Sequence, residues 1–350
     1  MSSRTTETLV IPAIKAAPNP DEILIPLFTG MWAMQAVATA ARLGLPDLLA
    51  VGPRTPEDVA AEAGTHPRAT RRLLRALANL SLASLVSGGR YELTAAGDRL
   101  RTGVPGTFKD AFIAETDEVH WQSWARAADA VRTGDPRPQA VFGMPAFDYY
   151  AKHREEGEQF GRAMENISRF AAHAVLEAYD FAGAPTVLDV GGGNGSMAIA
   201  ILEKYPEARG IVFDLPYIEK HAKERIRDLG VESRCRFEAG DFFQSIPRGA
   251  DVHLMKFILH DWDDEESLRV LRSSRAAIED GGRLVLIEMV VPEGDTSDMV
   301  HLMDLNMLVM TGGLERTAAE YGSLLEQAGF RLERVVPTAS PFSVIEARAV

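Results

Sequence analysis

The chain has 350 residues, more than one typical domain needs, so its length favours two domains. A formal net charge of −13 argues against nucleic acid as the main partner. The single cysteine, Cys235, excludes an internal disulfide framework and fits a reducing cytoplasm, where we expect the protein to be located. No basic region leads into a continuous apolar core near the N-terminus, so we expect no signal peptide.

The N-terminal region contains one stretch that is superficially similar to a membrane span. Residues 23–41 carry no charge and have about the length that a bilayer requires. The stretch includes Pro26, Gly30 and Gln35 and many alanines, which makes it only mildly apolar. We therefore expect a buried or subunit-interface helix rather than membrane insertion.

The next segment has the pattern of a winged helix. Thr55 and Pro56 are typical of a helix start, and this helix should end at Gly64. A second helix should run from Pro67 to about Leu80, and residues 82–93 read as a small hairpin. Arginines on the second helix leave a DNA-binding regulator as an alternative. The negative net charge of the chain and the length of the segment that follows count against DNA binding. These arginines are Arg68, Arg71, Arg72 and Arg75.

Residues 106–182 should be mostly helical and rich in bulky side chains. Most of these side chains are expected in the core, and a few are expected to line a substrate cavity. We predict three parts: a winged-helix-like dimerisation domain at 1–105, a helical connecting and substrate-lining segment at 106–182, and a catalytic domain at 183–350.

A glycine cluster marks the start of the catalytic domain. Residues 186–190 form an expected buried strand, glycines follow at 191, 192, 193 and 195, and helical composition follows from Met197 to Lys204. Glycines at a strand-to-helix turn indicate a tight bend or a close backbone approach to a ligand. The spacing does not match the dinucleotide fingerprint, and Asp189 lies inside the strand. An acid at this place favours a cationic cofactor, S-adenosylmethionine (SAM), and leaves an NAD-dependent oxidoreductase as a distant alternative.

Three more expected strands end in polar residues suited to such a ligand. Residues 210–214 end in Asp214, which is suited to a ribose diol, and residues 235–240 lead to Asp241 and Phe242, which are suited to an adenine. Residues 251–257 lead to His260. Ligands bind beyond the carboxyl ends of strands in open α/β sheets, so all four strand ends should meet at one crevice.

The remaining elements complete an α/β domain. We expect a strand at 283–291, an apolar helix at 300–310, and a capping box at Thr317 and Glu320 that begins another helix. The segments 330–336 and 342–347 should finish the sheet as an antiparallel pair.

One histidine and two carboxylates are candidates for catalysis. His260 stands at the expected mouth of the fourth strand, and the acids after it are explained by a helix start. Glu288 is a charge in an apolar strand, which is costly without a partner unless the strand end lies in solvent. Glu315 lies in a glycine-rich loop, where an ordinary surface acid is the alternative. Together the three suggest a base oriented by carboxylates.

As an ordered set, these motifs resemble the caffeate-type small-molecule O-methyltransferases, and more closely the bacterial branch that modifies aromatic natural products. The motifs are residues 188–195 (LDVGGGNG), 213–216 (FDLP), 240–243 (GDFF), 256–262 (KFILHDW) and 312–317 (GGLERT). The resemblance implies a Rossmann-like class I methyltransferase fold with a mostly parallel seven-stranded sheet. It also implies a homodimer formed by an N-terminal domain that does not bind DNA, SAM as cofactor with S-adenosylhomocysteine (SAH) as product, and no metal. From the composition we expect neither nucleic acid nor a membrane as partner.

The resemblance also implies a role for individual residues. His260 would be the general base, and Glu288 and Glu315 would hold its ring. Cofactor binding would fall to Asp189, Gly191, Gly193, Asp214, Leu215, Gly240, Asp241, Phe242, Lys256 and Ser168.

The acceptor would be an aromatic hydroxyl, with a carboxylate or a nitrogen as the alternative acceptor. Its pocket is expected to draw on Trp124, Phe160, Met164, Asp261, Met303, Asn306, Met307 and Met310. Methionine adapts to irregular ligand shapes, although simple helix core is the alternative for each bulky residue.

Overall fold

The structure, a computed structural model, describes residues 19–294 and 298–350. The N-terminal lobe contains one long helix and several shorter helices around one hairpin, with an apolar core that includes Leu45, Leu74 and Tyr91. Its elements are α1 (Pro20–Arg42), α2 (Leu45–Leu49), α3 (Pro56–Ala63), α4 (Pro67–Asn79), β1 (Ala83–Val86), η1 (Ser87–Gly89), β2 (Arg90–Leu93) and α5 (Ala95–Asp98). The winged-helix pattern is thus present, with Thr55 capping α3 and Gly64 ending it in a left-handed conformation.

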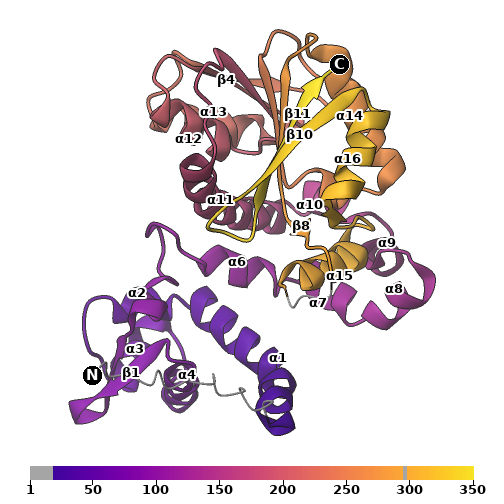
Figure 1. The fold of residues 1–350 in the computed structure, drawn as a ribbon. Helices are drawn as coiled ribbons and strands as arrows, with labels where there is room; N and C mark the ends of the chain where they lie inside the picture. Colours follow the sequence, from indigo (N-terminus) through magenta and orange to yellow (C-terminus); the bar gives the residue numbers. More distant parts are fainter. Residues whose placement is uncertain (1–18, 295–297) are drawn as a thin grey trace, which may run out of the picture.

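Six helices connect this lobe to the sheet (Figure 1). They are α6 (Lys109–Ala114), α7 (Glu118–Trp124), α8 (Ala127–Thr133), α9 (Arg137–Phe142), α10 (Ala146–Lys152) and α11 (Arg154–Ala178). Arg42 at the end of α1 donates hydrogen bonds to the carbonyl oxygens of Ile113 and Thr116, which fixes α1 against α6. Asp110 of α6 accepts hydrogen bonds from two side chains of α11, so α6 lies between the N-terminal lobe and the longest connecting helix.

A seven-stranded sheet forms the centre of the second lobe, in the order β10-β11-β7-β6-β3-β4-β5. The strands are β3 (Thr186–Val190), β4 (Arg209–Asp214), β5 (Cys235–Ala239), β6 (Val252–Lys256), β7 (Arg283–Glu288), β10 (Phe330–Pro337) and β11 (Ser343–Ala349). The first five run parallel, and β11 is antiparallel to both β7 and β10. The mostly parallel Rossmann-like sheet and the antiparallel final pair are therefore confirmed.

Helices cover both faces of this sheet. One face packs on α11, α12 (Ser196–Lys204) and α13 (Glu219–Asp228), and the other packs on α14 (Asp264–Ala277) and α16 (Ala318–Gln327). Alternation along β3 explains the division, because Leu188 and Val190 face one core and Val187 faces the other. The capping box predicted at Thr317 and Glu320 begins α16.

The order of the strands fixes the position of the site. The chain leaves β3 toward β4 on one side, and β6 returns to pair with β3 on the other. Such a reversal leaves a crevice at the carboxyl ends of the two central strands, where open α/β sheets bind ligands. The short elements η2 (Pro216–Ile218), η3 (Leu259–Asp261), β8 (Val290–Val291) and β9 (Arg316–Thr317) lie in loops, and α15 (Val300–Met310) follows β8.

Candidate active site

The glycine turn after β3 is shaped by close backbone contacts. Gly191 has a φ of +68°, and an added Cβ would overlap the side chain of Ile258 from the neighbouring β6 loop. A Cβ on Gly193, by contrast, would meet nothing within 4 Å. The positive φ therefore favours glycine at 191, and the turn leaves open space above Gly193 for a ligand to approach the backbone.

Asp189 lies beneath this turn and has a structural partner that the sequence analysis did not predict. Its Oδ2 accepts a hydrogen bond of 3.1 Å from the backbone N–H of Ala198 in the first turn of α12. Burial raises the pKa of Asp189 to about 6, and the nearby cation of Lys256 opposes the rise. An acid at this place thus anchors the start of α12 and adds negative charge below the crevice.

The ends of β4 and β5 contribute two further acids. Asp214 accepts hydrogen bonds from the backbone N–H groups of Gly193, at 2.8 Å, and Leu215, at 2.6 Å. Asp241 accepts a hydrogen bond of 2.8 Å from the N–H of Phe243. Because each carboxylate oxygen has two lone pairs, these contacts hold the acids in place and leave them able to accept bonds from a ligand.

An aromatic wall stands beside Asp241. The ring of Phe242 lies edge-on to Trp262 with centroids 6.1 Å apart, and Trp262 in turn stacks on Phe147 of α10. Gly240 lies directly before this wall, and a Cβ there would overlap the ring of Phe213. Trp262 was not predicted as a site residue, although it directly follows His260 and Asp261 in the strand-end motif.

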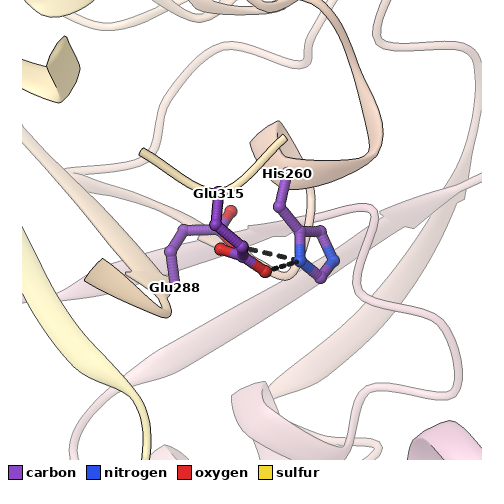
Figure 2. Close-up of side chains that lie close together, drawn as sticks. All are labelled: His260, Glu288 and Glu315. Carbon is purple, nitrogen blue, oxygen red and sulfur yellow. Dashed lines mark hydrogen bonds and ion pairs between the residues drawn. The ribbon is translucent and has the colours of Figure 1, made fainter. Parts of the chain in front are cut away.

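Figure 2 shows His260 facing two buried carboxylates from other parts of the chain. The Nδ1 of His260 lies 2.8 Å from Oε1 of Glu315 and 3.9 Å from Oε2 of Glu288. A carboxylate only accepts hydrogen bonds, so Nδ1 carries the proton of this bond. The other ring nitrogen, Nε2, is then the one able to take a proton from an acceptor.

Glu288 ends β7 without reaching solvent. It is 0% exposed, and its Oε1 accepts hydrogen bonds of 3.0 Å from the N–H groups of Ile258 and Leu259. Its Oε2 has no hydrogen-bond partner among the described residues, and burial raises its pKa to about 7. Both alternatives are therefore wrong. Glu288 does not lie at a solvated strand end, and Glu315 is buried and is not a surface acid.

These acids change the proton affinity of His260. Burial alone lowers its pKa, but the charges of Asp261 and Glu288 and the hydrogen bond to Glu315 outweigh burial and raise it to about 10. The free enzyme therefore holds an imidazolium at neutral pH. The same acids make the neutral ring a stronger base once the proton has left.

Arg316 fixes the loop that carries His260, and the sequence analysis missed it. Its guanidinium is 1% exposed and donates hydrogen bonds of 2.9 Å to the carbonyl oxygens of Leu259 and Trp262. Close packing completes the attachment, because a Cβ on Gly313 would overlap the carbonyl oxygen of His260. The only available signal was the position of Arg316 directly after Glu315.

Three predicted acceptor residues share one cavity of about 320 Å³. Trp124 donates a hydrogen bond of 2.8 Å from its indole to Oδ1 of Asn306, and Met303 lies beside them. Glu115, Met299 and Leu302 complete the lining and had not been predicted.

The other predicted acceptor residues lie elsewhere. Met307 and Met310 are buried, and Phe160 stacks on Tyr150 at 4.5 Å in the helical core. Met164 is half-buried on α11, and its carbonyl oxygen accepts the hydroxyl of Ser168. Asp261 lies in η3 beside His260, with Oδ1 3.9 Å from Nε2, and burial raises its pKa to about 6.

The fold and the site together define a class I methyltransferase, in which acids and a glycine turn at the strand ends adjoin a histidine held by carboxylates. Comparison with known proteins gives the family. Residues 124–331 match the O-methyltransferase domain, and residues 25–103 match the O-methyltransferase dimerisation domain. The chain belongs to this O-methyltransferase family and is a SAM-dependent methyltransferase.

Individual relatives agree with this assignment. The phenazine O-methyltransferase PhzM of Lysobacter antibioticus is 39% identical over 328 residues, which cover 94% of this chain and 96% of the relative. The O-demethylpuromycin-O-methyltransferase of Streptomyces alboniger is 40% identical over 336 residues, covering 94% and 89%. The structure of human N-acetylserotonin methyltransferase in complex with SAM superposes with a TM-score of 0.88 at 30% identity, covering 96% and 99%. An N,N-dimethyltransferase of 8-amino-8-demethylriboflavin from Streptomyces davaonensis, 34% identical over 88% of this chain and 89% of its own length, is also similar.

Proposed function

We propose that this enzyme methylates a hydroxyl group of an aromatic small molecule of secondary metabolism, with His260 as the general base. The observation that carries the proposal is the 2.8 Å hydrogen bond between Nδ1 of His260 and Glu315, which leaves Nε2 to receive a proton. The names of the relatives support the acceptor class, since several act on hydroxyl groups of natural products.

The donor would lie across the strand ends. SAM, when bound, supplies an electrophilic methyl group on a sulfonium. We propose that the backbone at Gly191 and Lys256 holds its methionine end, together with Asp189, Gly193 and Ser168. Asp214 and Leu215 would bind the ribose, and Gly240, Asp241 and Phe242 the adenine. The open space over Gly193 and the acids of β3, β4 and β5 fit such a cationic ligand.

His260 would remove the proton of the acceptor hydroxyl as its oxygen attacks. A phenol has a pKa of about 10 and is a weak nucleophile at neutral pH. General-base assistance typically contributes about 10²–10⁴ in rate. Positioning the two reactants can contribute about 7–11 kcal/mol, so the helical segment that shapes the acceptor cavity would contribute more than the base.

The acceptor would enter between α7 and α15, where Trp124, Met303 and Asn306 line the cavity. We propose that Met164 and Asp261 complete the pocket, and that Phe160, Met307 and Met310 support it from the core. A nitrogen acceptor is the second candidate, because relatives named as N-methyltransferases match most of this chain, and the structure of one of them has a similar fold.

We propose that transfer needs no metal. His260, Glu288 and Glu315 offer ligand atoms that lie within 4.8 Å of one another, a separation that suits a cation. All three groups already have direct partners, however, because Nδ1 of His260 is bound to Glu315 and Oε1 of Glu288 accepts two backbone N–H bonds. The set is therefore arranged to orient an imidazole.

The rest of the proposal concerns organisation and location. We propose that 1–105 is the dimerisation domain, 106–182 the connecting and substrate-lining segment, and 183–350 the SAM-binding catalytic domain. One described helix, α1, is long and apolar enough to cross a membrane. We assign its apolar face to a homodimer in the cytoplasm instead, with neither membrane nor nucleic acid as partner.

A transfer assay tests this function. The wild-type enzyme, incubated with methyl-labelled SAM, should label phenolic members of an aromatic panel and leave their O-methylated analogues unlabelled, with or without a chelator. Labelling confined to amines or carboxylates would contradict the hydroxyl acceptor, and loss of labelling with the chelator would contradict metal independence.

A further inference from the structure

One carboxylate of α11 contacts the glycine turn from outside the strand ends. Oε2 of Glu165 accepts a hydrogen bond of 2.9 Å from the side-chain amide of Asn194, between Gly193 and Gly195. Its other oxygen, Oε1, lies 3.0 Å from Nη2 of Arg225 on α13. We call Glu165, Asn194 and Arg225 the Glu165 clamp. It joins two helices of the same layer to the turn.

The clamp fixes both ends of the Asn194 amide. While its Nδ2 donates to Glu165, its Oδ1 accepts from the backbone N–H of Ser196 at 3.2 Å and from the Ser196 hydroxyl at 2.7 Å. Gly195, the residue before α12, has a φ of +80° and offers no side chain to cap the helix. Asn194 therefore provides the cap, and Glu165 determines which way its amide points.

The orientation of Asn194 is passed to the donor site through the preceding residue, Gly193. The backbone N–H of Gly193 donates a hydrogen bond of 2.8 Å to Oδ2 of Asp214, the acid proposed for the ribose. Gly193 has a φ of +57° and open space where a Cβ would lie, so no side chain packs against that side of it. A rotation of Asn194 would move this N–H away from Asp214.

The two contacts of Glu165 differ in their surroundings. The side chain of Glu165 is 21% exposed and that of Arg225 is 29% exposed. Arg225 also lines a cavity of about 420 Å³ between α11, α12 and α13, whereas the contact between Glu165 and Asn194 lies on the side of the turn. Water competes more with the ion pair, so the hydrogen bond to Asn194 contributes most of the effect.

We propose that Glu165 is a positioning residue for donor binding: it holds Asn194, and through Gly193 it sets the carboxylate of Asp214 for the ribose. This inference rests on the proposed donor site. Glu165 touches neither the donor nor the acceptor in this role. Because the ribose is common to SAM and SAH, both ligands depend on the clamp equally.

Calorimetric titration of the full-length enzyme with SAH tests the clamp. Glu165→Ala and Asn194→Ala should each raise the Kd for SAH about tenfold, the usual effect of losing a hydrogen bond to a charged group. Glu165→Gln keeps an acceptor for Asn194 and should restore most of the affinity, while Arg225→Met should raise the Kd about twofold to threefold. The double variant E165A/N194A should bind within about twofold of either single variant, because both remove one link.

Glu158→Ala is the matched control. Glu158 is also on α11, and it lies 2.8 Å from Arg154 and 3.7 Å from His221 of α13, so its loss loosens the same helix pair without touching Asn194. It should leave the Kd for SAH unchanged. At saturating SAM, E165A should keep its kcat and its KM for the acceptor within about twofold, since differences this small correspond to less than about 0.5 kcal/mol.

The outcomes separate the clamp from the proposed function. A wild-type enzyme that does not bind SAH would contradict the donor site itself. If E165A binds SAH as tightly as wild type, the role of the clamp is contradicted while the donor site stands. Additive losses of SAH affinity in the double variant would contradict the clamp in the same way. An equal loss of SAH affinity in E158A would show that Glu165 acts only through the packing of α11 against α13.

Discussion

His260 has two properties that act against each other at neutral pH. Its neighbours raise its pKa to about 10, so the ring is protonated there, whereas a general base must be neutral. The same hydrogen bond that raises the pKa also holds the ring, since Nδ1 is fixed on Glu315. Orientation and proton affinity are therefore set by the same contact, and a substitution at 315 changes both.

The substitution Glu315→Gln should therefore change the pH dependence of kcat/KM. With wild type, kcat/KM for the acceptor should rise as pH increases from about 7 toward the His260 pKa of about 10, because only the unprotonated His260 is active. The substitution removes the anion, so the rise should move to lower pH by about one unit or more, with a lower plateau. Glu326→Gln, which changes an exposed acid on α16, should leave the profile in place. An unshifted pH profile in E315Q would show that Glu315 does not raise the pKa of the titrating group.

At the scale of elements, the loop after β6 and the loop before α16 form one packed unit. Arg316 joins them by hydrogen bonds to the carbonyl oxygens of Leu259 and Trp262, and Gly313 lets the two backbones touch. Phe257, at the start of the first loop, has a φ of +55°, a strained value for a residue with a bulky side chain. This packing turns the chain sharply out of β6 and places His260 against Glu315.

Gly313→Ala should therefore damage stability and catalysis together. The new methyl group would overlap the backbone of His260, and overpacking of this kind typically costs about 1–3 kcal/mol of unfolding free energy. Turnover should fall further than stability explains, because the loop with His260 must move. Urea denaturation and steady-state kinetics measure both quantities.

Gly322→Ala provides the comparison on α16. A Cβ there would make an ordinary contact of 3.4 Å with Leu332, and alanine favours a helix interior by about 0.5–1 kcal/mol over glycine. A G313A enzyme with the stability and turnover of G322A would show that the two loops do not need this contact.

The elements themselves followed from local patterns, while their long-range partners did not. The glycine turn after β3, the capping box of α16 and the final strand pair depend on short spacings that propensity determines. The burial of Glu315 and the bonds of Arg316 join segments that are distant in the sequence, since His260 and Glu315 are 55 positions apart. The grouping of His260 with Glu315 was expected from the ordered set of motifs, whereas no spacing in the sequence indicates the bonds of Arg316 or distinguishes Met303, at the cavity, from Met310, in the core.

At the scale of the whole molecule, α1 presents an apolar face that the described residues of its own chain leave uncovered. Its N-terminal half exposes several large side chains, with Phe28 73% exposed and its ring 5.3 Å from that of Trp32. The exposed residues are Ile23, Leu24, Ile25, Leu27, Phe28, Met31 and Trp32. Patches of this kind mark interaction sites, and the match of residues 25–103 to a dimerisation domain indicates a second copy as the partner.

Phe28→Asp combined with Trp32→Asp should convert the dimer into a monomer. Burial of one large apolar side chain contributes about 1.5–3 kcal/mol, and the double substitution removes two from each protomer. Light scattering after size exclusion measures the mass. Val131→Asp, at an equally exposed apolar position on α8, should leave the dimer intact. A dimeric F28D/W32D protein would place the interface elsewhere.

The most direct test of the account is turnover by His260→Ala with SAH affinity measured on the same preparation. We expect kcat to fall by about 10²–10⁴, the usual contribution of a general base. The Kd for SAH should stay close to that of wild type, because His260 is not assigned to the donor. Turnover near the wild-type value would contradict the central claim.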